Sequence, residues 1–118
     1  MGGSDKIFRP LYMGLNVVSN MFSCNGLRIY HNRLTKKIVI ENAYEWVNMT
    51  PEHFKILLVL IRGEKPEKFT IQTDNISIEF CRLKRGFFIT MYCRSYISTV
   101  TISYDTLEIL RNSSVRLI

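Results

Sequence analysis

Aromatic and cationic side chains alternate at strand spacing in the segment FFITMYCRSY, residues 87–96. Side chains of a β-strand point alternately to its two faces. An unbroken strand would therefore place on one face Phe88, Thr90, Tyr92, Arg94 and Tyr96. The opposite face would be apolar and belong to the core, with Phe87, Ile89, Met91 and Cys93. Flat rings beside a positive charge can stack unpaired bases and neutralise their phosphates. The alternative is that the tyrosines cover a cross-strand patch, which is common in sheets.

Two short basic segments, RLTKK at 33–37 and LKRG at 83–86, have the composition of exposed turns. Their recurrence in two halves of the chain favours a contact with phosphate over a merely solvated hairpin tip, where lysine is also common. The cations in and beside these turns are Arg28, Arg33, Lys36 and Lys37 in the first half and Arg82, Lys84 and Arg85 in the second.

A weaker aromatic pair lies in the first half of the chain. Trp46 is the one tryptophan of the sequence, and Tyr44 shares its strand parity. We expect this pair to offer a second stacking surface. A lone tryptophan at a strand end belongs to the core equally often, and the sequence leaves both interpretations open.

Residues for catalysis or metal binding are sparse. His31 and His53 occupy non-equivalent places, one in an expected strand and one in the first turn of an expected helix. The three cysteines, Cys24, Cys81 and Cys93, have neither metal-ligand spacing nor an adjacent base in a recognisable motif. No glycine pattern suits a phosphate-binding loop. We therefore expect a protein that is not an enzyme and that holds no metal and no cofactor.

Composition and charge narrow the class of protein further. The chain has 118 residues, a net charge of +6 and 47% hydrophobic residues, which suits one globular domain with a moderately basic surface. No apolar run approaches the ~18 residues of a membrane span, so we expect no membrane partner. An odd number of cysteines without a signal sequence predicts reduced thiols and an intracellular location. The start of the chain, MGGSDK within residues 1–11, has the character of an expression scar.

The pattern of elements occurs twice. Strand periodicity at 15–22, 27–31, 37–42 and 44–49 is followed by a helix over 51–62, capped by Thr50 and ended by Gly63. The second half has strands at 69–73, 76–82, 87–93 and 96–102, and then a helix capped by Ser103. The first helix is apolar nearly all round, which predicts that it is covered on both sides. Between basic turn and helix cap, the second copy is four residues longer than the first.

This repetition predicts an α+β fold of two tandem ββββα units, 12–63 and 64–118, joined through the linker-like segment 63–68. Because one unit is too small to bury its own apolar face, we expect the units to form one compact, dimer-like domain. It would have curved antiparallel sheets, two packed helices and a pseudo-twofold axis. Further association into a true homodimer stays open.

The first unit resembles the single-stranded-DNA-binding domain of the positive cofactor four family of transcriptional coactivators. That family has a phenylalanine, a strand with (M/L)R, a basic FKGK turn, a VLIDI-type strand, an aromatic segment ending at tryptophan and an LNPEQW-type helix start. The counterparts in this sequence are Phe22, LR at 27–28, LTKK at 34–37, IVIEN at 38–42, Trp46 and MTPEHF at 49–54. The second unit keeps LKRG, FFITM and SYDTL but has no tryptophan. The family usually forms homodimers of one-unit chains, whereas this chain holds two units.

The resemblance implies phosphate contacts by Lys36 and Lys37 and a bound strand near Trp46. Together with the second-half aromatics it predicts a single-stranded nucleic-acid-binding protein of transcription or replication, with little sequence preference. DNA is the expected ligand, and RNA stays open. The sequence is rich in isoleucine, asparagine and lysine, as expected of a protein encoded by an AT-rich, viral genome. We therefore expect the protein in the nucleus or at a site of viral replication. The alternative is a protein-interaction module of a larger assembly that has lost nucleic-acid binding.

Overall fold

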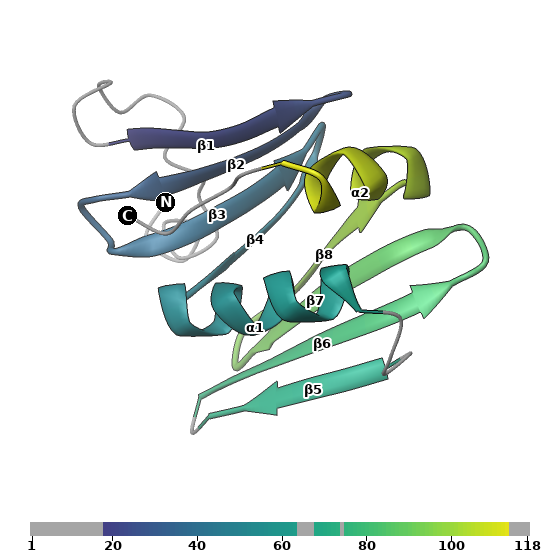
Figure 1. Ribbon diagram of the computed structural model, residues 1–118. Coiled ribbons are helices and arrows are strands. Elements are labelled where there is room, and N and C mark those ends of the chain that lie inside the picture. Colours follow the sequence, from purple (N-terminus) through teal and green to yellow (C-terminus); the bar gives the residue numbers. More distant parts are fainter. Residues whose placement is uncertain (1–17, 64–67, 74, 114–118) are drawn as a thin grey trace.

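The computed structural model describes residues 18–63, 68–73 and 75–113 of the chain (Figure 1). Its first half consists of β1 (Val18–Cys24), β2 (Leu27–Asn32), β3 (Lys37–Asn42), β4 (Glu45–Met49) and α1 (Pro51–Arg62). Its second half consists of β5 (Lys68–Gln72), β6 (Ile76–Leu83), β7 (Gly86–Cys93), β8 (Ile97–Ile102) and α2 (Tyr104–Arg111). The expected ββββα order is therefore present in both halves. The proposed scar at 1–11, the unit boundaries at 12 and 64, and most of the linker lie outside the described residues.

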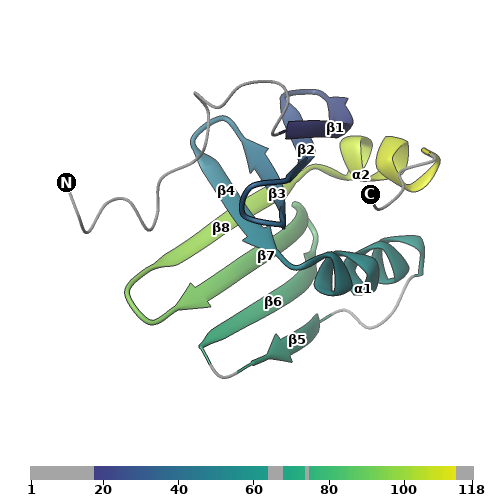
Figure 2. The ribbon, with the colours of Figure 1, turned by 90° about the vertical axis from the view of Figure 1, so that its left-hand side faces the viewer.

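The fold is α+β, with two four-stranded antiparallel sheets and two helices. Sheet A has the order β1-β2-β3-β4 and sheet B the order β5-β6-β7-β8, so each is a simple meander. Asn25 and Gly26 make the tight turn between β1 and β2, both with positive φ, 52° and 84°. Figure 2 shows both helices on the same side of the two sheets. We call the sheet faces toward the helices the inner faces and those away from them the outer faces.

One continuous apolar core fills the space between the inner faces and the helices. It joins both sheets and both helices, and its largest members are Phe54, Phe80, Phe87, Leu57, Ile29 and Ile40. The predicted inward set Phe87, Ile89 and Met91 is fully part of it. The prediction that α1 is covered on both sides is wrong, because Ile56 and Val59 on its solvent side are 36% and 64% exposed. The two helices lie in one layer over the sheets, so the solvent side of α1 is not covered by the other helix (Figure 2).

Both helix starts follow the predicted chemistry. The Thr50 hydroxyl accepts from the His53 amide at 3.2 Å, and the Ser103 hydroxyl accepts from the Thr106 amide at 3.3 Å. Each cap satisfies a backbone donor that the first turn of a helix leaves unpaired. The end of α1 is held from sheet B, where Arg82 donates to the carbonyls of Leu60 and Gly63 at 3.0 and 2.9 Å.

Strand register shows where the two halves differ in length. In sheet A the inner pair Asn42–Glu45 precedes the hairpin tip, and the corresponding pair in sheet B is Met91–Ser98. Two residues separate the first pair and six the second, so the extra four residues of the second half all fall at the tip of the β7–β8 hairpin. We call residues 92–97 the hairpin extension.

The two sheets meet at the edge strands β4 and β8, which contact one another. Side chains bridge this junction in place of a continuous backbone ladder. Asn42 donates to the Thr101 carbonyl and the Thr101 amide donates to the Glu45 carboxylate, both at 3.0 Å, and the Ser98 hydroxyl donates to the Trp46 carbonyl. These contacts cover strand edges that would otherwise present unpaired backbone groups.

Candidate nucleic-acid interface

The outer face of sheet B presents three rows of side chains, each crossing four strands. Neighbouring members of a row lie about 5 Å apart, close enough to act as one surface. The row at the tip end is Gln72, Ser77, Tyr92 and Ile97. The middle row is Thr70, Glu79, Thr90 and Thr99, and the third is Lys68, Cys81, Phe88 and Thr101. The predicted alternation of Phe88, Thr90 and Tyr92 on one face is confirmed.

Three apolar side chains of this face are open to solvent, and one of them, Leu83 at the end of β6, is 47% exposed. Tyr92 is 40% exposed and its cross-strand neighbour Ile97 is 67% exposed. Phe88 is half-buried, and the Arg85 guanidinium carbon lies 6.0 Å from the centre of its ring. Sequence reasoning missed Ile97, although its parity with Thr99 and Thr101 placed it opposite the buried Val100. The surface thus combines rings, an aliphatic patch and a cation.

The placement of Arg94 and Tyr96 on the face of Tyr92, which assumed a strand unbroken through residue 96, is wrong. β7 ends at Cys93, whose amide donates to the Tyr96 carbonyl at 2.8 Å and so closes the turn to β8. Arg94 is exposed in that turn instead of standing beside Tyr92 on the strand face. Because the strand ends there, its two-residue alternation ends with it.

Tyr96 turns toward the junction of the two sheets. Its ring lies 6.1 Å from the ring of Trp46, and both rings pack against the core. Burial raises the pKa of Tyr96 to about 12, with a further contribution from its hydrogen bond with Cys93. The two rings therefore join the halves of the molecule, and Tyr96 is not part of the open surface.

Several side chains on the outer face of sheet A are buried. Tyr30 and Glu41 are 1% and 5% exposed. The Arg28 guanidinium binds the Glu41 carboxylate at 2.9 Å and lies 5.0 Å from the Tyr30 ring centre, and the Tyr30 hydroxyl donates to Glu41 at 3.3 Å. Arg28, a predicted phosphate contact, is thus already paired with a carboxylate.

The basic turn of sheet A projects beyond its strands. The Asn32 side chain accepts from the amides of Leu34 and Thr35 at 2.9 and 3.2 Å, which shapes the turn. Lys36 adopts a positive φ of 62° and is exposed, while Lys37 is half-buried at the start of β3. Arg33 is exposed in the same turn. At the other end of sheet A, Tyr44 is 95% exposed at the tip of the β3–β4 hairpin.

The basic turn of sheet B is tighter. Lys84 and Arg85 are its two exposed residues, and Gly86 follows at a place where a Cβ would lie 2.8 Å from the Ile102 carbonyl oxygen. Arg82 differs from them because it lies on the inner face and holds the end of α1. The two basic turns lie at opposite ends of the molecule, so they do not form one common patch (Figure 1).

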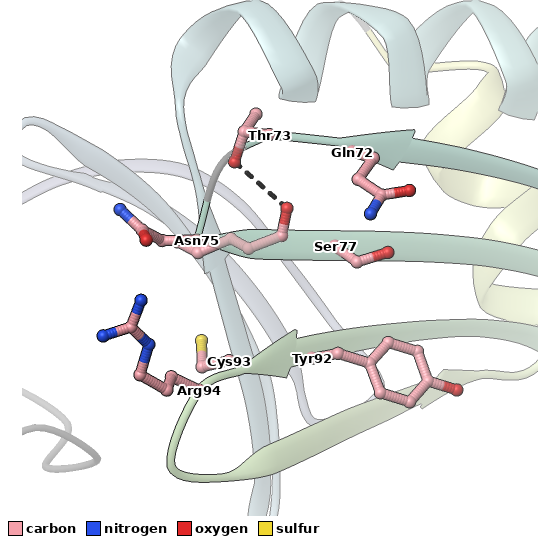
Figure 3. A pocket seen from close by; sticks show the side chains of 8 residues that line it. Gln72, Thr73, Asn75, Ser77, Tyr92, Cys93 and Arg94 are labelled. Atoms are coloured by element: carbon pink, nitrogen blue, oxygen red, sulfur yellow. Dashed lines mark hydrogen bonds between the residues drawn. The ribbon is translucent and has the colours of Figure 1, made fainter.

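A surface hollow of about 280 Å³ opens at the tip end of sheet B (Figure 3). We call it the tip hollow, and its lining residues are Gln72, Thr73, Asn75, Ile76, Ser77, Tyr92, Cys93 and Arg94. The Thr73 hydroxyl donates to the Ile76 carbonyl at 3.0 Å and closes the β5–β6 end of the hollow. None of its polar residues was a sequence candidate except Arg94, because polar strand residues carry no signal by themselves.

One further ion pair lies on the outer face of sheet B. The Lys68 Nζ and the Glu79 carboxylate are 3.2 Å apart, and the hydrogen bond that Lys68 donates to Glu79, together with the negative charge of Glu79, raises the pKa of Lys68 above its ordinary value. Each outer face therefore holds one carboxylate that engages a cation. Lys84, Arg85 and Arg94 are cations near the exposed rings for which the structure describes no carboxylate partner within 4 Å.

Within the described ranges, no three His, Cys, Asp or Glu side chains gather in a way that could hold a metal ion. Cys24, Cys81 and Cys93 are free and half-buried. Neither of the two described helices is long and apolar enough to cross a membrane. No protein-family model, curated protein or solved structure matches this chain. The resemblance to the positive cofactor four family therefore stays a prediction.

Proposed function

We propose that this protein binds single-stranded nucleic acid on the outer face of sheet B, and that the ligand is DNA. The observation that carries the proposal is the placement of Tyr92 and Phe88 on one face, with the Arg85 guanidinium 6.0 Å from the Phe88 ring. Proteins that bind single strands combine such rings with cations along the path of the backbone.

In the proposed mechanism, one set of residues stacks bases and another neutralises phosphates. Tyr92 and Phe88 are four residues apart on β7, about 13 Å along the strand, so they would receive two different bases of one strand. Lys84 and Arg85 at the start of β7 would neutralise phosphates beyond Phe88. Since every base has a flat face, stacking alone would confer little sequence preference.

We further infer that the chain is a tandem repeat whose halves take the place of two subunits around a pseudo-twofold axis. Three observations support this inference: the identical element order, the equivalent caps Thr50 and Ser103, and the matching inner rows of the sheets. The rows Ile29–Ile40–Val47 and Phe80–Ile89–Val100 occupy the same positions in sheets A and B.

A second candidate function is a protein-interaction module of a transcription or replication assembly. Two observations favour it. Arg28 and Lys68, which could have contacted phosphates, are paired with Glu41 and Glu79. Ile97 is an exposed aliphatic side chain that suits a protein partner better than a base.

The deciding experiment measures binding of a fluorescent single strand and of the matching duplex at two salt concentrations. We expect tighter binding to the single strand, because a duplex hides the base faces that Tyr92 would contact. Tyr92→Ala should weaken single-strand binding about five- to a hundredfold. Tyr104→Ala removes a similarly exposed ring, 36% exposed on α2, and should leave binding unchanged. Equal binding of single strand and duplex, or equal losses in both variants, would favour the interaction module.

A further inference from the structure

Strand β5 leaves one edge of sheet B unpaired. Among the described residues it pairs with β6 alone, and it forms the margin of sheet B that lies away from the junction with sheet A (Figure 1). Four of its five residues are exposed, and the exception is Ile71. A strand edge of this kind offers a row of backbone donors and acceptors to another strand.

β5 lacks the features by which proteins usually block such an edge. Its register with β6 is unbroken, whereas β1, the corresponding strand of sheet A, has a bulge between Asn20 and Phe22. The strand contains neither proline nor glycine. Its one charged side chain, Lys68, is held by the Glu79 carboxylate at 3.2 Å, so the positive charge is compensated within the same sheet.

A ring of the inner face is also exposed at this edge. Phe69 stands in one inner row with Phe80 and Ile89, which are 1% and 0% exposed, yet Phe69 itself is 38% exposed. The row ends at β5, so one side of the Phe69 ring has no neighbouring strand. A strand added beside β5 would cover that side and remove apolar surface from water.

The hydrogen-bonding pattern of β5 determines which residues would face an added strand. The Thr73 amide donates to the Ile76 carbonyl at 2.9 Å, which makes these two residues a hydrogen-bonded pair at the turn. Because hydrogen bonds alternate along an antiparallel strand, residues 69 and 71 bond to β6 in the same way. The amides and carbonyls of residues 68, 70 and 72 therefore point away from β6, and Thr70 is the middle one of the three.

We propose that β5 pairs antiparallel with β5 of a second copy, about a twofold axis at Thr70. In this register Lys68 faces Gln72 of the second copy, and Phe69 faces Ile71 of the second copy. No like charges meet, and each ring packs against an aliphatic side chain. The strand is thus complementary to itself, as a symmetric dimer requires, which is why the partner is a second copy of this chain.

The pairing goes beyond the proposed function and does not depend on it. The twofold axis of an antiparallel strand pair runs perpendicular to the sheet, so the outer faces of the two copies would lie side by side on one surface. A single strand bound there would cross both copies and meet Tyr92 of each.

The test measures self-association of the full chain by analytical ultracentrifugation, without nucleic acid. We expect a dimer with a dissociation constant in the micromolar range, because the paired area lies at the small end of specific interfaces. Thr70→Pro removes the central outward amide of each copy and should raise the constant about ten- to a hundredfold, the effect of two lost hydrogen bonds. Edge strands tolerate proline where the amide faces solvent, so circular dichroism should show a folded monomer. Thr70→Val is the matched control, since it keeps the amide and the branched side chain and should leave the dimer unchanged.

A pair of charged variants tests the register. Residue 70 faces residue 70 of the second copy, so Thr70→Lys and Thr70→Glu should each weaken the dimer about fivefold through two like charges in water. An equimolar mixture of the two variants should restore the wild-type constant, because lysine then faces glutamate. Thr70→Lys also covers the case in which Thr70→Pro fails to fold, since lysine is common on edge strands.

Three results would overturn the proposal. The first is a wild-type protein that stays monomeric up to about 1 mM, where even a weak dimer would form. The second is a dimer that the folded Thr70→Pro and Thr70→Lys proteins retain, which would place the interface on another surface. The third is a mixture of the lysine and glutamate variants that associates no better than either variant alone. None of these results bears on single-strand binding, which Tyr92→Ala tests separately.

Discussion

The outer faces of sheets A and B have the same strand order but carry different side chains. The register places Arg28 and Glu41 of sheet A at the positions that Glu79 and Thr90 occupy in sheet B. Sheet A closes its face with an ion pair. In sheet B Glu79 instead pairs with Lys68 of the edge strand at 3.2 Å, and the Thr99 hydroxyl donates to the Thr90 hydroxyl at 3.1 Å.

The difference is larger at the hairpin tips. Tyr92, Arg94 and Ile97 all belong to the hairpin extension, six residues that stand where sheet A has only Ala43 and Tyr44. The exposed ring of sheet B and part of the lining of the tip hollow thus lie in the longer of the two hairpins. The strand order common to both halves builds the core and the junction, and the longer β7–β8 hairpin carries the ring that we propose for binding.

The largest expected effect is a difference in stability between variants of two outer-face tyrosines, Tyr30 of sheet A and Tyr92 of sheet B. Tyr30→Ala should lower the free energy of unfolding by about 3–5 kcal/mol, because it empties a fully buried site that also holds Glu41. Tyr92→Ala should lower it by no more than about 0.5 kcal/mol, as is usual for surface positions. Urea denaturation of both variants measures the difference. Similar losses in the two variants would mean that Tyr92 is a core residue and that the contrast between the faces fails.

The next largest effect is a difference in stability between variants of two cations of sheet B, Arg82 and Lys84. Arg82→Ala should cost about 2 kcal/mol of stability, because its two hydrogen bonds to carbonyls at the negative end of α1 are lost. Lys84→Ala, two residues away at the exposed turn, should change stability by about 0.5 kcal/mol or less. Thermal melting of both variants provides the measurement. A strong loss of single-strand affinity in a folded Arg82→Ala protein would instead assign Arg82 to the binding surface.

Salt dependence compares the two basic turns. The double variant of Lys84→Ala and Arg85→Ala should reduce the slope of log affinity against log salt by about 1.4, or ~0.7 for each phosphate contact on a single strand. The double variant of Lys36→Ala and Lys37→Ala should reduce it less, since Tyr30 on the outer face of sheet A is buried and cannot stack a base. Binding isotherms at several salt concentrations give both slopes. Equal reductions would show that both sheets bind, and unchanged slopes in both would place the phosphates elsewhere.

The smallest expected effect concerns Tyr96 at the junction between the two sheets. Burial favours the neutral form of Tyr96, so its contribution to stability is complete below the ordinary pKa of 10.0 and is lost as the pH rises through about 12. Absorbance titration of the folded protein should therefore show one late tyrosinate step that Tyr96→Phe removes. If the Tyr96→Phe protein keeps the late step, the ring is not buried against Trp46 as described.

Much of the fold could be predicted because it depends on local patterns. Two-residue periodicity located the strands, and Thr50 and Ser103 identified the helix starts through the orphan amides that hydroxyl caps satisfy. The same periodicity put Phe88 and Tyr92 on one face and Phe87, Ile89 and Met91 in the core.

Predictions that needed contacts between distant residues were less complete. Periodicity indicated a strand end at residue 93 but not the directions of the side chains in the turn that follows, so Arg94 and Tyr96 were assigned to a face they do not share. The exposure of Val59 depends on the helices lying in one layer, which no helical pattern encodes. Gln72 and Ser77 are ordinary polar strand residues until the register brings them beside Tyr92.

The sequence by itself determined the order of elements, their caps, the inward side chains and the basic character of two turns, since each depends on residues close together in the chain. Tertiary structure decided which of those residues remain available. It paired Arg28 with Glu41 across two strands, turned Arg82 toward the end of α1 and set Tyr96 against Trp46 of the other half. The reason is physical: a charge or a ring is neutralised or buried by whatever the fold brings within a few ångströms, and strand register and sheet packing choose that neighbour.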